Sequence, residues 1–270
     1  MIGNYFKIKI DGASNELYKF DEYDKILNFY GYQRFGSKRP VTHLIGRSLI
    51  RRNFANAIEL LLSFTSKYDK PENTTLREMM ADKSNYNDAL KIIPRSMDLE
   101  KIALKEMIEH GNPIAAIRNL PLSIRRFFVQ SYQSYIFNKT LSMAFENGEE
   151  LFSPQTGDVC YDKHSNLGKF ENDPLQRLSV PFVGYSYYKK TRFNCYIEKI
   201  LKDEGIIPKD FFSKEMQEIS NEGGFRNSSI KCSDYVAQDN TVSFSVSRGS
   251  FATIVLREIM KPENPLFSGF

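Results

Sequence analysis

Residues 28–52 read NFYGYQRFGSKRPVTHLIGRSLIRR, and the interpretation of the whole chain starts from this stretch. It opens with aromatic residues, passes through Gly31 and Gly36, and continues into a basic segment with helical spacing. Rings interleaved with cations suit a single-stranded polynucleotide, because rings stack on bases while Lys and Arg neutralise phosphates. The alternative is a buried aromatic cluster beside a solvated basic helix face. Composition alone favours neither.

The composition is that of an ordinary globular protein. The 270 residues are 41% hydrophobic and 26% charged, and the net charge of +4 implies that any nucleic-acid surface is a local patch. No run of about 18 apolar residues occurs, so no membrane-spanning helix is expected. Three scattered cysteines favour a reduced, cytoplasmic setting over a zinc knuckle.

The order of the residues is more specific than their composition. FYGYQRFGS followed by RPVTHLIG resembles the N-Y-F-G-x-Q-R-F-G signature of the TruD family of tRNA pseudouridine synthases, especially its archaeal and eukaryotic branch. FVQSYQSYIFN, within residues 124–145, resembles the H-x-Y-Q-S-Y-L-F-N helix of that family, although most of these side chains are expected to pack the helix rather than contact RNA. VSRGSFATIVLRE, residues 246–258, resembles its closing strand and helix. The matches span nearly the whole chain.

The resemblance implies an α+β fold. A pseudouridine synthase core, with a mixed and mostly antiparallel sheet plus helices, would carry a large inserted α/β TRUD domain. Residues 1–36 and 224–270 would then belong to the catalytic core and residues 37–223 to the insertion. The RNA would lie in the cleft between the two.

The resemblance also implies a reaction, the isomerisation of uridine to pseudouridine at position 13 of tRNA. It needs no cofactor and no metal. By match to the family's G-N-x-F motif, Asn4 would help to shape the active site and Phe6 would stack on the uracil; the alternative for Phe6 is an ordinary core residue of its strand, and only the motif match favours the stacking role. The RNA-binding residues implied are Tyr32, Gln33, Arg34, Lys38, Arg39, Arg47, Arg51 and Arg226.

The nucleophile of the family is the aspartate of a G-x-K-D-[KR]-x-A-x-T-x-Q motif that precedes G-N-x-F. No such motif occurs in these 270 residues, and Asp11, Asp21 and Asp24 lie in unrelated contexts. We therefore expect the C-terminal portion of a TruD-type enzyme, with tRNA and a missing N-terminal half as partners. The alternative is a catalytically inactive RNA-binding module.

Periodicity and turn residues predict the secondary structure. Strands are expected at residues 5–10 and 241–247, and residues 147–180 read as hairpins and loops. Residues 66–75 read as a loop, and Ser250 reads as the N-cap of the last helix. The expected helices cover residues 16–29, 41–49, 54–62, 76–80, 86–93, 99–109, 113–120, 124–145 and 194–203.

Overall fold

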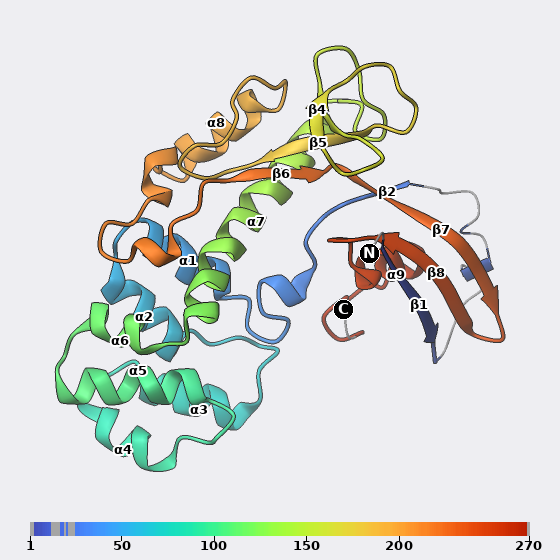
Figure 1. Cartoon of the computed structure of the whole chain (residues 1–270). Coiled ribbons are helices and arrows are strands. Elements are labelled where there is room, and N and C mark those ends of the chain that lie inside the picture. Colours follow the sequence, from blue (N-terminus) through green and yellow to red (C-terminus); the bar gives the residue numbers. More distant parts are fainter. Residues whose placement is uncertain (1–2, 12–16, 19, 21–24, 269–270) are drawn as a thin grey trace.

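The computed structural model describes residues 3–11, 17–18, 20 and 25–268, and within them the fold is α+β (Figure 1). One antiparallel sheet has the strand order β1-β8-β7-β2. Its strands are β1 (Gly3–Lys9), β2 (Lys25–Leu27), β7 (Ser229–Gln238) and β8 (Thr241–Ser247). Segments from the two ends of the chain therefore share one sheet.

Alternation of side chains along β1 separates a face that packs on the sheet core from an exposed face. Phe6 stands opposite Phe244 of β8 and packs on the sheet core, whereas Tyr5, Lys7 and Lys9 are exposed. The helix α9 (Ala252–Met260) contributes apolar side chains to the same core. The strand predicted at residues 5–10 is confirmed within about two residues.

A second antiparallel sheet has the order β4-β3-β5-β6. Its strands are β3 (Val159–Tyr161), β4 (Leu167–Lys169), β5 (Arg177–Phe182) and β6 (Gly224–Asn227). After Ser228 the chain passes directly from β6 into β7, so residues 224–238 link the two sheets (Figure 1). The buried Ser228 fixes this link, because its hydroxyl donates to Leu151 O at 2.6 Å and its N–H donates to Leu178 O at 3.1 Å.

The remaining chain is mainly helical. The helices are α1 (Thr42–Ile50), α2 (Phe54–Ser63), α3 (Pro71–Met79), α4 (Tyr86–Ile92), α5 (Asp98–Glu109), α6 (Pro113–Asn119), α7 (Leu122–Glu146) and α8 (Asn194–Asp203). The long helix α7 runs from this helical part to the second sheet (Figure 1). Helix α1 approaches α7 closely at Gly46, where an added Cβ would lie 2.0 Å from Phe128 O. Only glycine fits that contact.

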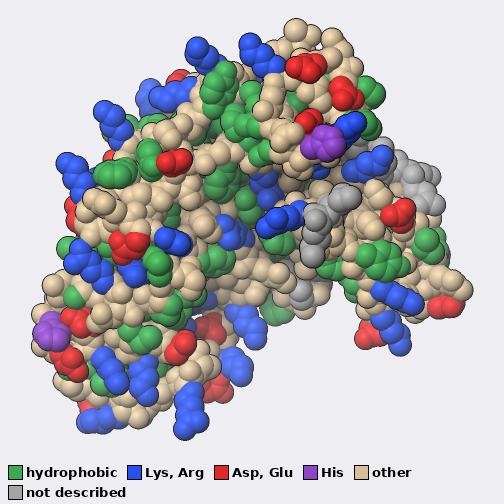
Figure 2. Space-filling view, in the orientation of Figure 1, with side chains coloured by type: hydrophobic (Ala, Val, Ile, Leu, Met, Phe, Trp, Pro, Cys, Tyr) green, Lys and Arg blue, Asp and Glu red, His purple; other side chains and the backbone are tan. Residues whose placement is uncertain are grey.

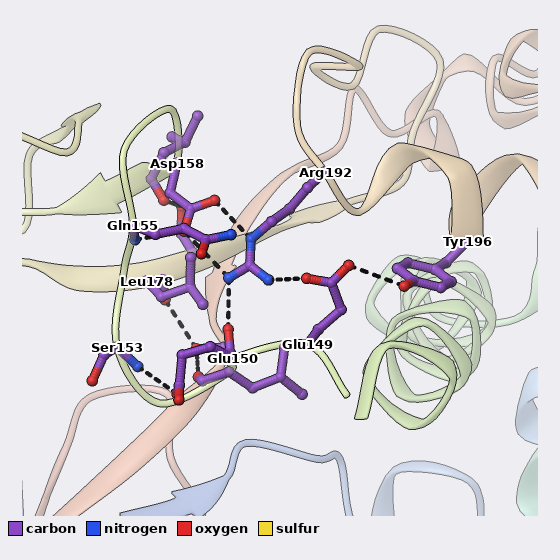
Figure 3. Close-up of polar contacts among 12 residues, drawn as sticks. Glu149, Glu150, Ser153, Gln155, Asp158, Leu178, Arg192 and Tyr196 are labelled. Carbon is purple, nitrogen blue, oxygen red and sulfur yellow. Dashed lines mark hydrogen bonds and ion pairs between the residues drawn. The ribbon is translucent and has the colours of Figure 1, made fainter. Parts of the chain in front are cut away.

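Arg192 anchors the loops beside the second sheet (Figure 3). Its Nε donates to Asp158 Oδ1 at 2.9 Å, its Nη2 donates to Glu150 O at 2.6 Å, and it also pairs with Glu149. Burial lowers the pKa of Arg192, but the two carboxylates outweigh it and the net shift is upward. Tyr196 of α8 donates to the same Glu149 at 3.0 Å. One guanidinium thus joins the C-terminal end of α7, the loop before β3 and the start of α8.

Three local predictions are wrong. Lys25–Leu27, predicted as part of a helix, is a strand because it pairs with β7; much of the remaining predicted helix lies outside the described residues. Half of the predicted loop 66–75 is helical, because Pro71 occupies the first turn of α3, where proline is tolerated. The last helix is not capped by Ser250: the cap position is Phe251, and the Ser250 hydroxyl pairs with that of Ser247.

Candidate nucleic-acid interface

Residues 28–34, the start of the motif stretch, lie between helix α7 and helix α9. The side chain of Asn138 on α7 accepts from Tyr30 N and donates to Tyr30 O, both at 2.9 Å. On the other side Gly31 packs against α9, since an added Cβ would lie 3.2 Å from the side chain of Ile254. The segment is therefore held by its backbone, and its side chains line the junction between the first sheet and the helical part.

The ring of Tyr30 is the centre of an aromatic cluster at this junction. Its centroid lies 5.8 Å from that of Phe137 on α7, 6.1 Å from that of Phe182 on β5 and 6.1 Å from that of Phe251 before α9. Phe251 is 40% exposed, so the cluster reaches the surface. Exposed rings beside cations are the side chains on which unpaired bases stack.

Arg226 lies over one side of this cluster. Its guanidinium carbon is 4.0 Å from the centroid of the Tyr30 ring. Nη2 donates to Asn28 Oδ1 at 2.6 Å, Nε to Asn28 O at 3.2 Å and Nη1 to Gly249 O at 2.9 Å. These bonds join the segment 28–30, strand β6 and the turn before α9 through one side chain.

Arg34 is the second cation of the cluster. Its guanidinium carbon lies 5.3 Å from the Tyr30 ring centroid and 4.8 Å from that of Phe127. Nε donates to Ser134 Oγ at 3.0 Å and Nη2 to Gln130 Oε1 at 3.4 Å, both on α7. Nη1 has no hydrogen-bond acceptor among the described residues, so two N–H groups stay available.

Both guanidiniums lack a carboxylate partner within the described part of the chain. Burial lowers the pKa of Arg34, and Tyr30 opposes that shift. Burial also lowers the pKa of Arg226; Tyr30 opposes this shift, and the charge of Arg34 adds to it. Both remain cations near neutral pH, because an arginine is protonated far above that range. Two desolvated positive charges without a counter-ion form a site that favours an anion.

The other predicted RNA-binding residues divide into two groups. Gln33, Lys38 and Arg51 are exposed, and Tyr32 is half-buried with the Arg257 guanidinium 5.8 Å from its ring centroid. Figure 2 shows Lys and Arg side chains around the hollow between the helical part and the part that contains β1 and α9.

Arg39 and Arg47 instead have carboxylate partners inside the fold. Arg39 Nη2 lies 2.9 Å from Glu100 Oε1, and its Nη1 donates to Leu61 O at 2.9 Å. Arg47 Nε lies 3.0 Å from Glu204 Oε2, which also accepts from Tyr132 at 3.2 Å. These two arginines hold helices together, and RNA contact by either stays a prediction.

The predicted uracil-pocket residues lie on β1. Asn4 is exposed opposite Val246, and Phe6 is half-buried with its ring centroid 5.8 Å from that of Phe244. The Phe6 ring thus packs against the core of the first sheet, and its stacking on uracil stays a prediction.

The site prediction omitted the side chains that position Arg34, namely Gln130 and Ser134, and it omitted Phe251. The signal for the α7 pair is the polar spacing within FVQSYQSYIFN, because Gln130 and Ser134 are one helical turn apart. No group of three or more His, Cys, Asp or Glu side chains that could hold a metal ion occurs within the described ranges. No helix described here is long and apolar enough to cross a membrane.

Together, fold and site define an α+β protein whose helical part and first sheet meet at an aromatic, cationic junction. Comparison with known proteins makes this class specific. A family model described as tRNA pseudouridine synthase D (TruD) matches residues 1–259. The chain therefore belongs to the TruD family, and the family resemblance is confirmed.

Individual relatives agree with this assignment. A protein of Methanopyrus kandleri named "Probable tRNA pseudouridine synthase D" is 32% identical over 97% of this chain and 65% of its own length. One of the same name from Pyrobaculum islandicum is 32% identical over 99% of this chain and 66% of its own length. The crystal structure of a putative tRNA pseudouridine synthase D from Methanosarcina mazei matches 98% of this chain and 70% of that chain, with a TM-score of 0.82 and 26% identity. The chain spans about two thirds of the length of the curated relatives it matches.

Proposed function

We propose that this polypeptide belongs to an enzyme that isomerises uridine, at position 13 of tRNA, to pseudouridine in the cytoplasm. The observation that carries the proposal is a pair of guanidiniums, those of Arg34 and Arg226, beside the ring of Tyr30. Neither guanidinium has a carboxylate partner in the described residues. A phosphate of the tRNA supplies the missing negative charge, and exposed rings such as Phe251 offer stacking surfaces. Family membership supports tRNA as the nucleic acid.

The chemistry requires a carboxylate at the ribose, a flipped uridine and a ring against the extruded base. The family's G-x-K-D motif is not in this sequence, so we propose that the nucleophilic aspartate comes from a polypeptide segment outside these 270 residues. Asn4 and Phe6 would contribute to the uracil pocket from strand β1.

The proposed division into domains follows the same logic. Residues 1–36 and 224–270 would form the remainder of the catalytic domain, and residues 37–223 would form the inserted domain. The separate hydrophobic clusters of the first sheet with α9 and of the helical part support this division, although β6, after the second boundary, pairs with β5 of the proposed insertion.

The test of RNA binding is the salt dependence of tRNA affinity for an Arg34→Met variant. Loss of one phosphate contact should weaken binding and reduce the slope of log affinity against log salt by about one. Lys105→Ala is the control, because Lys105 is exposed on α5 in the helical part. An unchanged slope in the Arg34 variant would contradict the proposed phosphate contact.

A second candidate function, RNA binding without catalysis, is favoured by the absence of the aspartate motif. Pseudouridine formation is therefore assayed with this chain alone and with an added segment that contains the motif. Activity only in the mixture supports the enzyme, and tRNA binding without activity in either sample supports the binding module. Activity of this chain alone would show that its nucleophile is one of its own residues.

A further inference from the structure

A small polar pocket lies next to Arg34, on the N-terminal half of α7. Its volume is about 230 Å³, and it is bounded by the helix on one side and by residues 218–221 on the other. It connects to the junction through Gln130, which lines the pocket and accepts from Arg34. The lining side chains are Arg126, Gln130, Glu218, Ile219, Ser220 and Asn221. We call it the Gln130 pocket.

Two amide groups that line the Gln130 pocket already accept a hydrogen bond from within the protein. The oxygen of Gln130 accepts from Arg34 Nη2 at 3.4 Å, and the oxygen of Asn221 accepts from Gly223 N at 2.9 Å. Each amide therefore presents its NH₂ group, and neither NH₂ group has an acceptor among the described residues. A ligand that fits here has hydrogen-bond acceptors on one edge.

An acidic residue, Glu218, also lines the pocket. Glu218 pairs with Arg125, and hydrogen bonds from its own backbone N–H and from Arg125 hold the pKa of Glu218 below its usual range, against the effect of burial. It is 37% exposed and ionised, so it accepts hydrogen bonds and repels a phosphate. Arg126 Nε donates to Glu218 O at 2.8 Å, which fixes a guanidinium plane at the rim.

Two amide donors beside a carboxylate acceptor match the edges of guanine. Its N1–H and N2–H₂ groups are adjacent donors for one carboxylate, while O6 and N7 accept from amide groups. Uracil, cytosine and adenine lack a pair of adjacent ring N–H and amino donors. An unpaired base can in addition stack on a guanidinium plane such as that of Arg126.

We infer that the Gln130 pocket binds an unpaired guanine base of the RNA that Arg34 contacts. This inference rests on the proposed RNA binding and adds a sequence-reading position to it. A free guanine nucleotide carries the same base, so the experiment distinguishes a free nucleotide from a guanine within RNA.

The probes are guanosine 5′-monophosphate, inosine 5′-monophosphate, which lacks the N2 amino group, and the other nucleoside monophosphates. Binding is followed by protein NMR shifts at up to about 10 mM ligand, a range that detects millimolar affinities. Guanosine monophosphate should bind tightest. Glu218→Gln should weaken it about tenfold and remove its advantage over inosine monophosphate. Gln130→Glu keeps the oxygen that accepts from Arg34 but removes the two donors, and should weaken guanosine monophosphate similarly.

Glu215→Gln is the matched control, because Glu215 lies near Glu218 in the chain but pairs with Arg52 at 3.3 Å. It should leave guanosine binding unchanged, and the melting temperature of each variant reports its folding. Equal binding of guanosine monophosphate and the other nucleoside monophosphates, no binding at about 10 mM, or an unchanged guanosine preference in folded Glu218→Gln would overturn the inference.

The RNA arm compares a uridine pentamer with the same pentamer carrying one central guanosine. Tighter binding of the guanosine pentamer than of both the uridine pentamer and guanosine monophosphate supports an RNA base as the ligand, and equal or weaker binding than either one refutes it. Failure of the Gln130 pocket leaves the salt dependence of Arg34 unaffected, so this outcome is distinguishable from failure of the proposed function.

Discussion

Glu100→Ala should destabilise the helical part more than any single change of its arginine partners. Glu100 Oε1 lies 2.9 Å from Arg39 Nη2 and 2.9 Å from Arg77 Nη2. The side chains of Glu100 and Arg77 are only 8% and 5% exposed. Removal of the carboxylate leaves two neighbouring buried guanidiniums, and the charge of Arg77 already lowers the pKa of Arg39, although burial is the larger cause.

The magnitude follows from what each side chain retains. Breaking a buried ion pair by removing one partner costs about 3–5 kcal/mol. Arg77 keeps Asp69 at 3.3 Å and Arg39 keeps Leu61 O at 2.9 Å, so we expect about 3–4 kcal/mol for Glu100→Ala. Arg39→Met should cost less, about 2 kcal/mol, because Glu100 still pairs with Arg77. The double variant should cost less than the sum, since the two residues are in contact.

Urea unfolding followed by far-UV circular dichroism and tyrosine fluorescence measures these changes, since the chain has 15 Tyr and no Trp. The same samples test the RNA role predicted for Arg39. If its charge serves the fold, folded Arg39→Met should keep the wild-type salt slope of tRNA binding, unlike Arg34→Met. A loss below about 1 kcal/mol for Glu100→Ala, the value typical of an exposed pair, would refute the reasoning.

Further changes test packing and titration. Gly46→Ala should destabilise by about 1–3 kcal/mol or more, because its Cβ would meet Phe128 O at 2.0 Å; urea midpoints measure this, and a neutral effect would contradict the close approach of α1 and α7. Gly184→Ala should be at least as damaging, since its Cβ would lie 2.1 Å from Gly223 N, and wild-type stability would show that this crossing opens freely. Burial lowers the pKa of His43 to about 4, so the unfolded chain binds the proton first and stability should fall as pH drops from about 6.5 toward 4. His43→Phe should reduce that slope, and an NMR titration of His43 near 6.5 would contradict the shift.

The spacing of apolar residues predicted the helices whose buried faces are visible in the local sequence. Helix α8 was predicted with its observed bounds, and α2 and α7 within about two residues, because their apolar faces repeat at helical spacing. The strand Lys25–Leu27 could not be predicted in this way. It pairs with Ser229–Lys231, about two hundred residues later, and a three-residue strand in such a pairing has little period of its own.

The charges of the candidate site also depend on residues that are distant in the sequence. The motif directed attention to the segment that lies at the junction, but it could not separate Arg34 from Arg39 or Arg47. The carboxylates that neutralise Arg39 and Arg47 come from residues 61 and 157 positions away. Whether a cation has a partner is therefore decided by tertiary structure.

The chain has a net charge of only +4, so the place of its positive potential depends on which arginines lack an acidic partner. Arg39 and Arg47 face Glu100 and Glu204, and such pairs contribute little field at a distance. Arg34 and Arg226 have no carboxylate partner in the described ranges and are partly desolvated, so their field is screened less than that of exposed lysines. A mildly basic protein can in this way attract a polyanion to one place. We propose that this place is where the segment 28–34, α7 and α9 meet, and an RNA bound there would contact both proposed domains at once.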